Sequence, residues 1–275
     1  MLKEQAHIAV PTAFLEDESL DLEGTINHIR NLYGQGIKSV LVSGTTGEQH
    51  SLSSKEKMEL IDRLEEEEEL MGEMEIIFGV SSVWQKDAER LAEKIQDRRI
   101  AGVMLGFPPY ILPTQAEALI YAKRIIERSK KPTILYNNPK RTGFDLSVES
   151  ILELSKLDAV AGIKDAGDKE KIEAIKKNLG RTDFYFYAGG EVNLEEKVSY
   201  GYDRLSSIAG NVDPKEIREW FHGLLRDQQG REQEYNKIAK ILDQVYQGNA
   251  IVNVKRILNQ QGIQMGACRS PIGKA

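Results

Sequence analysis

The 275-residue sequence contains a single cysteine, Cys268, and only four histidines. One cysteine cannot form an intramolecular disulfide and cannot supply a cysteine-based zinc site. The histidines at positions 7, 28, 50 and 222 are scattered, and none stands at ligand spacing from another. We therefore assign no metal ligand, and the cysteine content is typical of a reducing compartment such as the cytoplasm.

The sequence also lacks long apolar runs and an excess of positive charge. No run approaches the roughly 18 residues that span a bilayer, and residues 1–20 show no signal-peptide pattern. Lys and Arg total 37 against 43 Asp and Glu, which gives a net charge of -6. This balance argues against a nucleic-acid or membrane partner. We therefore expect a soluble cytoplasmic protein.

What the sequence does have is a regular alternation of short apolar runs and amphipathic stretches. The runs are nearly continuous, as is typical of parallel strands that are buried on both faces. They lie at 7–14, 38–44, 74–81, 101–108, 132–139, 158–167, 183–190 and 204–210. Eight β/α units predict a (β/α)₈ TIM barrel, with a doubly wound open sheet as the main alternative because periodicity does not report closure.

Helix starts are marked between these runs. Ser53 with Glu56, and Thr114 with Glu117, stand at the spacing of a capping box, and an Asp-Pro pair at 213–214 is typical of an N-cap followed by proline. After about residue 225 the strand pattern stops, and two helices broken near Gly248 are expected. We therefore predict a barrel domain over 1–225 and a C-terminal helical region over 226–275 that packs on the barrel.

In a barrel of this kind, the carboxyl ends of the strands meet at one mouth, where active sites lie. The turn from Gly44 to Gly47 follows the second run and offers two hydroxyls and backbone N–H groups, a suitable cradle for a small carboxylate. The same composition also fits a plain loop or a phosphate-binding loop. The polar side chains expected at the mouth are Thr45, Thr46, Tyr110, Tyr136, Arg141 and Lys164.

Lys164 ends the apolar run at 158–167, and two interpretations of it stay open. A lysine at a strand end is commonly solvated. A partly desolvated amine, in contrast, is nucleophilic and can condense with a ketone to form a Schiff base, with a nearby tyrosine such as Tyr136 moving protons. Tyr136 can equally be a core residue, and Arg141 a surface arginine. No G-x-S-x-G motif supports a serine hydrolase.

Three motifs resemble those of one known family. "SGTTGE" looks like its pyruvate-carboxylate motif, "YNNPKRTG" like its proton-shuttle segment and "GIKDAG" like its Schiff-base strand. From residue 7 to 272 the sequence resembles the dihydrodipicolinate synthase / N-acetylneuraminate lyase family of pyruvate-dependent class I aldolases.

The resemblance implies a role for each matched residue. Lys164 would form the imine with pyruvate, Thr45 and Thr46 would hold its carboxylate, and Tyr136 would relay protons. Tyr110 would reach into the site of a neighbouring subunit, so a homodimer or homotetramer is expected. Gly189 would place its backbone beside the substrate. The covalent imine would make a separate cofactor unnecessary.

Arg141 resembles the arginine with which the synthase branch binds the carboxylate of aspartate semialdehyde, so condensation of that aldehyde with pyruvate is the first expectation. The alternative is a catabolic aldolase or dehydratase that acts on 2-keto-3-deoxy sugar acids or N-acetylneuraminate. A non-catalytic barrel that binds a keto acid is a third interpretation. The stretch "AGGEVN" at 188–193 differs from the Gly-Asp-Asp stretch usual in the synthase.

Overall fold

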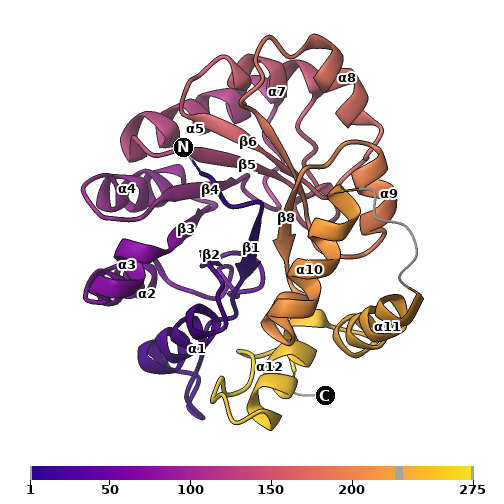
Figure 1. Cartoon of the computed structure of the whole chain (residues 1–275). Coiled ribbons are helices and arrows are strands. Elements are labelled where there is room, and N and C mark those ends of the chain that lie inside the picture. The colour runs from indigo at the N-terminus through magenta and orange to yellow at the C-terminus, as the bar shows by residue number, and fades with distance from the viewer. Residues whose placement is uncertain (1, 227–231, 274–275) are drawn as a thin grey trace.

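Eight parallel strands form a closed barrel in the computed structural model, which describes residues 2–226 and 232–273 (Figure 1). Each strand pairs with the next in sequence, and β8 pairs with β1 to complete the ring. The predicted TIM barrel is confirmed, and the open sheet is excluded. The strands are β1 (Ala6–Ala9), β2 (Ser39–Val42), β3 (Glu75–Val80), β4 (Gly102–Gly106), β5 (Thr133–Asn137), β6 (Val160–Asp165), β7 (Tyr185–Ala188) and β8 (Arg204–Ser207).

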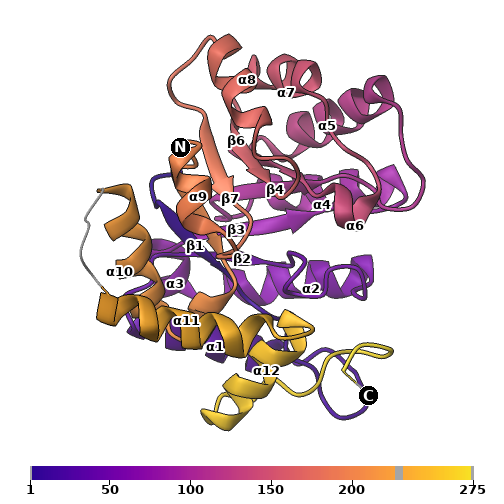
Figure 2. The ribbon, with the colours of Figure 1, turned by 90° about the vertical axis from the view of Figure 1, so that its right-hand side faces the viewer.

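Helices follow every strand and surround the barrel (Figures 1 and 2). Both predicted capping boxes are present, at Ser53 with Glu56 and at Thr114 with Glu117. Asp213 caps the helix that begins at Pro214, as predicted. The helices are α1 (Leu22–Gly34), α2 (Ser54–Glu65), α3 (Glu68–Glu73), α4 (Gln85–Gln96), α5 (Gln115–Ser129), α6 (Pro139–Thr142), α7 (Val148–Ser155), α8 (Lys171–Asn178), α9 (Leu194–Ser199), the 3₁₀ turn η1 (Ala209–Asn211), α10 (Pro214–Leu225), α11 (Glu232–Tyr246) and α12 (Ala250–Gln260).

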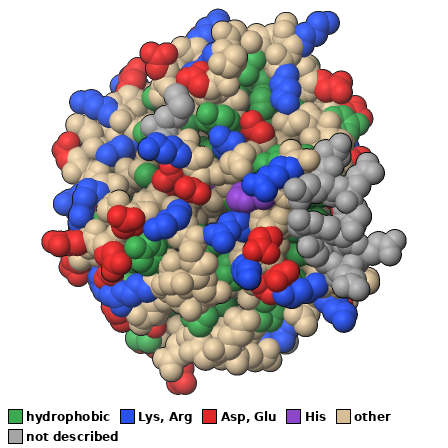
Figure 3. All heavy atoms as spheres, in the orientation of Figure 1, with side chains coloured by type: hydrophobic (Ala, Val, Ile, Leu, Met, Phe, Trp, Pro, Cys, Tyr) green, Lys and Arg blue, Asp and Glu red, His purple; other side chains and the backbone are tan. Residues whose placement is uncertain are grey.

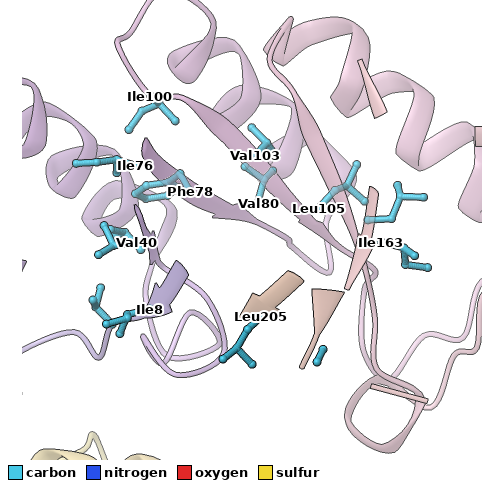
Figure 4. Packing of buried hydrophobic residues seen from close by; sticks show 14 of the residues in the cluster. Ile8, Val40, Ile76, Phe78, Val80, Ile100, Val103, Leu105, Ile163 and Leu205 are labelled. Atoms are coloured by element: carbon cyan, nitrogen blue, oxygen red, sulfur yellow. The ribbon is translucent and has the colours of Figure 1, made fainter. Parts of the chain in front are cut away.

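Alternate residues of the strands belong to two separate apolar clusters. The outward set packs with the helices and includes Ile8, Val40, Phe78, Leu105, Ile163 and Leu205 (Figure 4). The inward set fills the barrel and includes Ala9, Leu41, Ile77, Met104, Ile134 and Tyr187. Because side chains alternate along a strand, the residue that follows an outward one faces into the barrel. This alternation orients the side chains at the mouth.

Helices α11 and α12 lie together beside the barrel, next to α10 and the 3₁₀ turn η1 (Figures 1 and 2). Between them the chain turns at Gly248, whose φ of 85° favours glycine, and Asn249 caps α12. A buried ion pair of 2.7 Å joins Lys255 of α12 to Glu48, which follows the turn after β2. The expected domain boundary between residues 225 and 226 stays a prediction, and residues 227–231 lie outside the described part of the chain.

Charged side chains of both signs are interspersed over the face seen in Figure 3, without a large area of one sign. Among the helices that the structure describes, none is long and apolar enough to cross a membrane.

Candidate active site

Lys164 lies inside the mouth of the barrel. It follows the outward-facing Ile163 on β6, so its side chain points inward, and only 7% of it is exposed. Burial lowers the pKa of the Lys164 amine, and the pKa stays below its usual value although Tyr136 and Glu191 favour the charged form. A larger share of this amine is therefore neutral at pH 7 than of an exposed lysine.

Tyr136 stands directly across from Lys164 in the β5–β6 register. The amine nitrogen lies over the tyrosine ring, 4.6 Å from its centre. The phenol oxygen is 3.4 Å from Thr45 Oγ1 and accepts a hydrogen bond of 2.7 Å from Asn138 Nδ2. Burial acts to raise the pKa of this phenol, but Lys164, the two hydrogen-bond partners and Arg141 outweigh it, so the pKa falls below its usual value.

The turn after β2 brings Thr45 and Thr46 to the same space. Thr45 lines both cavities at the mouth, and the buried Thr46 lines the larger of them. Gly47 lies behind the turn, where its carbonyl accepts a 2.7 Å hydrogen bond from Thr12 Oγ1. A Cβ at Gly47 would meet three atoms at 3.2 Å, among them backbone atoms of Ser43 and Val10. Gly47 therefore shapes the turn and does not line the cavities.

Two adjoining cavities of about 270 Å³ and 520 Å³ open at the mouth. They share a wall of five residues, Thr45, Tyr136, Asn138, Arg141 and Lys164. Arg141 is an exposed residue of the short helix α6, so its guanidinium lies at the rim, where it can meet an anionic group of a ligand.

Gly189 follows β7 and lines the larger cavity. A Cβ at this position would lie 3.3 Å from Lys164 Cε and 3.2 Å from the Cβ of Ala166. The backbone of Gly189 therefore approaches the amine closely, and a side chain there would crowd it.

Tyr110 is not part of the wall of either cavity in this chain. Its side chain is 90% exposed, and its backbone has a φ of 76°. Ile111 and Leu112 beside it are also exposed. Of the residues predicted at the mouth, Tyr110 is the one that the fold does not bring to the others, and its role across a subunit interface stays a prediction.

Several wall residues were not predicted. Asn138 stands two positions after Tyr136 in the same motif, and its amide was an available signal. The larger cavity is also lined by Ile208, which precedes η1, by Tyr246 at the end of α11 and by Asn249 in the turn before α12. These residues carry no local signal, because only the packing of distant segments brings them to the amine.

The arrangement supplies a buried amine, a phenol with a lowered pKa, a hydroxyl turn and a guanidinium around one space. Such a set can bind a small keto acid through its carboxylate, attack its ketone carbon with the amine and move protons. Within residues 2–226 and 232–273, no three His, Cys, Asp or Glu side chains converge in a way that could hold a metal ion.

Comparisons with known proteins match almost the whole chain. A family model described as the Dihydrodipicolinate synthetase family matches residues 4–275. A 4-hydroxy-tetrahydrodipicolinate synthase of Methanothermobacter thermautotrophicus is 30% identical over 272 residues, which cover 97% of this chain and 95% of that protein. The synthase of Oceanobacillus iheyensis is 28% identical over 269 residues, covering 96% and 89%.

Solved structures of synthases also match almost the whole chain. The dihydrodipicolinate synthase of Aquifex aeolicus superposes with a TM-score of 0.88 at 26% identity, covering 98% of this chain and 92% of that one. The synthase of Acinetobacter baumannii, solved in complex with pyruvate, gives a TM-score of 0.85 at 28% identity with coverage of 98% and 92%.

Proposed function

Because the chain belongs to the Dihydrodipicolinate synthetase family, as its motifs predicted, we propose that it is a Schiff-base-forming lyase that condenses pyruvate with an aldehyde. Aspartate semialdehyde is the first candidate for that aldehyde, which makes the activity that of a 4-hydroxy-tetrahydrodipicolinate synthase, the activity for which its relatives are named. The observation that carries the proposal is the buried Lys164 amine held 4.6 Å above the Tyr136 ring.

The chemistry follows from these groups. The neutral Lys164 amine attacks the ketone carbon of pyruvate, and the resulting carbinolamine loses water to give a protonated imine. Thr45 and Thr46 hold the carboxylate. Tyr136 relays protons during loss of water and during removal of a methyl proton, which leaves an enamine. The enamine carbon then attacks the aldehyde, and Arg141 binds the carboxylate of that second substrate. The protonated imine on Lys164 is the electron sink, so the reaction uses no separate cofactor. The amine of the second substrate then attacks the imine carbon and displaces Lys164, which closes the ring and frees the enzyme.

The site is completed by a neighbouring copy of the chain in this proposal. Tyr110 joins Thr45 and Tyr136 of that copy in a hydroxyl relay, in a homodimer or homotetramer. The support is the exposure of Tyr110, Ile111 and Leu112, three large side chains in a row on one loop. The enzyme acts in the cytoplasm, where its one cysteine stays reduced.

The first experiment is reduction with borohydride in the presence of pyruvate, followed by intact-mass measurement and peptide mapping. We expect one pyruvate-derived adduct, on Lys164, and none in Lys164→Ala. Lys57 is the matched control because it is also buried and its pKa is lowered by burial to about 8, yet it does not line the cavities. Lys57→Ala should keep the adduct. Folded protein without an adduct would favour a keto-acid-binding barrel.

The aldehyde is tested by turnover. Aspartate semialdehyde should be consumed together with pyruvate, whereas cleavage of 2-keto-3-deoxy sugar acids or N-acetylneuraminate in its place would establish the catabolic alternative. Arg141→Ala should raise KM for the aldehyde by about 10- to 100-fold, the loss expected for a hydrogen bond between charged groups, and leave pyruvate trapping unchanged. An unchanged KM would remove Arg141 from the second-substrate site.

A further inference from the structure

A buried carboxylate, that of Glu191, lies behind the wall of the larger cavity. Glu191 follows β7 and is 1% exposed. Its oxygens accept hydrogen bonds from Ser207 Oγ at 2.5 Å, from the backbone N–H groups of Ile208 and Ala209 at 3.1 and 3.2 Å, and from the Tyr246 hydroxyl. Burial of a charge is costly without such partners, so this set of four donors is suited to holding a carboxylate in its ionised form.

All four donors are neutral groups. Among the described residues, Glu191 forms no ion pair, and the cations on which its charge acts are Lys164 and Lys197. Neutral donors hold the negative charge in place and, unlike a cation, offset only part of it. Its field therefore reaches the buried Lys164 nitrogen, where burial limits screening by bulk water.

Glu191 and Lys164 are connected through the cavity wall. Gly189, two residues before Glu191, is the position at which a Cβ would lie 3.3 Å from Lys164 Cε. Tyr246, which donates to Glu191, lines the larger cavity together with Lys164. Glu191 itself is not among the residues that line this cavity. It therefore acts on the amine from behind the wall and does not touch a bound ligand.

Tyr136 also favours the charged form of Lys164, but the groups other than Glu191 that act on this amine do not supply a fixed negative charge. Arg141 and Lys197 are cations, and burial lowers the pKa of His7 to about 3, so His7 is neutral at pH 7. Tyr136 is a phenol that has to exchange its proton during the reaction. Of the groups that favour the charged form of Lys164, Glu191 is the carboxylate.

We propose that Glu191, positioned by Tyr246 of α11, is the fixed counter-charge of the Lys164 nitrogen, both as the ammonium and as the protonated imine. The part of this proposal that concerns the protonated imine rests on the proposed function. Glu191 is thus a positioning residue that stabilises a cation formed by its neighbour. Through Tyr246, the C-terminal helical region becomes part of the electrostatics of the site.

The first test measures Lys164 without any substrate. Competitive acetylation of the folded protein over a pH series, read by peptide mapping, gives the midpoint at which Lys164 becomes reactive. Glu191→Gln keeps the shape and removes the charge, so the midpoint should move to lower pH by about half to one unit. Lys57 in the same digest is the internal reference and should keep its midpoint.

The matched control is Glu195→Gln, which removes the same charge from an exposed position in the first turn of α9. It should leave the Lys164 midpoint where it is in the wild type. Circular dichroism and thermal unfolding check that each variant is folded. A midpoint in folded Glu191→Gln that equals the wild-type value would overturn the proposal.

Tyr246→Phe gives a second test, in which the Lys164 midpoint should shift in the opposite direction. Loss of the phenol removes one donor that partly neutralises the carboxylate, so Lys164 should feel a stronger negative field and its midpoint should rise. A fall or no change in folded Tyr246→Phe would contradict the assignment, and this variant carries the test if Glu191→Gln does not fold.

Pyruvate trapping separates this inference from the proposed function. If the wild type traps pyruvate but the Lys164 midpoint is unchanged in Glu191→Gln and Tyr246→Phe, the counter-charge role of Glu191 is refuted and the proposed function is not. If the Lys164 midpoint shifts in both variants but the wild type traps no pyruvate, the proposed lyase activity and the role of Glu191 beside the imine are refuted. Glu191 then remains the counter-charge of the free amine.

Discussion

Lys164 and Tyr136 change each other's protonation, and the pKa of each lies below its usual value. Burial lowers the pKa of the amine, while the amine contributes to the lowered pKa of the phenol. A general acid–base group works best when its pKa lies near the working pH, and both shifts are in that direction. The pair is therefore suited to exchange of a proton during imine formation.

Removal of the phenol should slow the chemistry far more than it weakens the fold. For Tyr136→Phe we expect imine formation with pyruvate to slow by about 10²- to 10⁴-fold, the usual contribution of a general acid–base group. Asn138 Nδ2 loses its 2.7 Å acceptor, which should cost about 1 kcal/mol of stability. Rapid-quench borohydride trapping measures the rate.

Tyr121→Phe is the control for this prediction. Tyr121 is a buried phenol of α5 that donates a 3.3 Å hydrogen bond to the Gly106 carbonyl and does not line the cavities. It should lose a similar amount of stability and trap pyruvate at the wild-type rate. If Tyr136→Phe also traps at the wild-type rate, Tyr136 is not the proton relay.

At the scale of elements, the close packing of β3 against the end of β2 holds the hydroxyl turn in place. A Cβ at Gly79 of β3 would lie 2.1 Å from the backbone oxygen of Ser43, which immediately precedes Gly44 and Thr45. Backbone atoms cannot swing aside as side chains can. Gly79→Ala should therefore displace the turn, destabilise the protein by about 1–3 kcal/mol and raise KM for pyruvate.

Urea unfolding and initial-rate kinetics measure both effects. Gly72→Ala is the matched control, since Gly72 lies in α3 with no atom within 4 Å of the added Cβ. Alanine there should add about 0.5–1 kcal/mol of stability through helix propensity and leave KM unchanged. A wild-type KM in Gly79→Ala would show that β3 does not position the turn.

At the scale of the whole molecule, buried polar contacts join α1 and η1 to β1, beside the seam at which β8 pairs with β1. His28 of α1 hydrogen-bonds through Nε2 to Asn211 Oδ1 at 2.8 Å, and Asn211 Nδ2 donates to the carbonyl of Ala9 at the end of β1. His7 lies on β1 itself. Burial lowers the pKa of His28 to about 4 and that of His7 to about 3, so both are neutral in the folded protein at pH 7.

These histidines predict a loss of stability in mild acid. Their folded pKa values lie below the value of 6.5 in the unfolded chain, so the unfolded state takes up protons first as the pH falls. The stabilisation is complete above pH 6.5 and is lost progressively toward pH 4 and 3. Between pH 6 and 5, the free energy of unfolding should fall by about 2 kcal/mol, measured by urea unfolding.

His28→Gln should remove about half of that decrease. His222→Gln, at a half-buried position on α10, should change it less. Burial raises the pKa values of Asp165 and Asp203, so their protonation in the folded state stabilises the protein as the pH falls and opposes the effect of the histidines. The wild type and His28→Gln are therefore compared above pH 5. An equal loss of stability in the wild type and in His28→Gln would contradict the prediction.

Local patterns were enough to predict the elements and several of the residues that line the mouth. Seven strands lie within a predicted apolar run, and β1 begins one residue before its run, at Ala6. The helix caps at Ser53, Thr114 and Asp213 form as expected, because burial alternation and capping act over a few residues. The first run extends to residue 14, but β1 ends at Ala9, since Pro11 has no N–H group for the ladder. Lys164, Tyr136 and Thr45 were predictable because each stands in a short motif at a strand end.

The sequence by itself thus determined eight β/α units and the family, and it placed at the strand ends the residues that we propose to carry the chemistry. Only the tertiary structure decided that the sheet closes through β8 and β1, that Tyr110 lies outside the mouth, and that Tyr246 reaches Glu191 from α11. The reason is physical. Elements depend on neighbours along the chain, whereas closure and the counter-charge depend on contacts between segments that are tens to hundreds of residues apart.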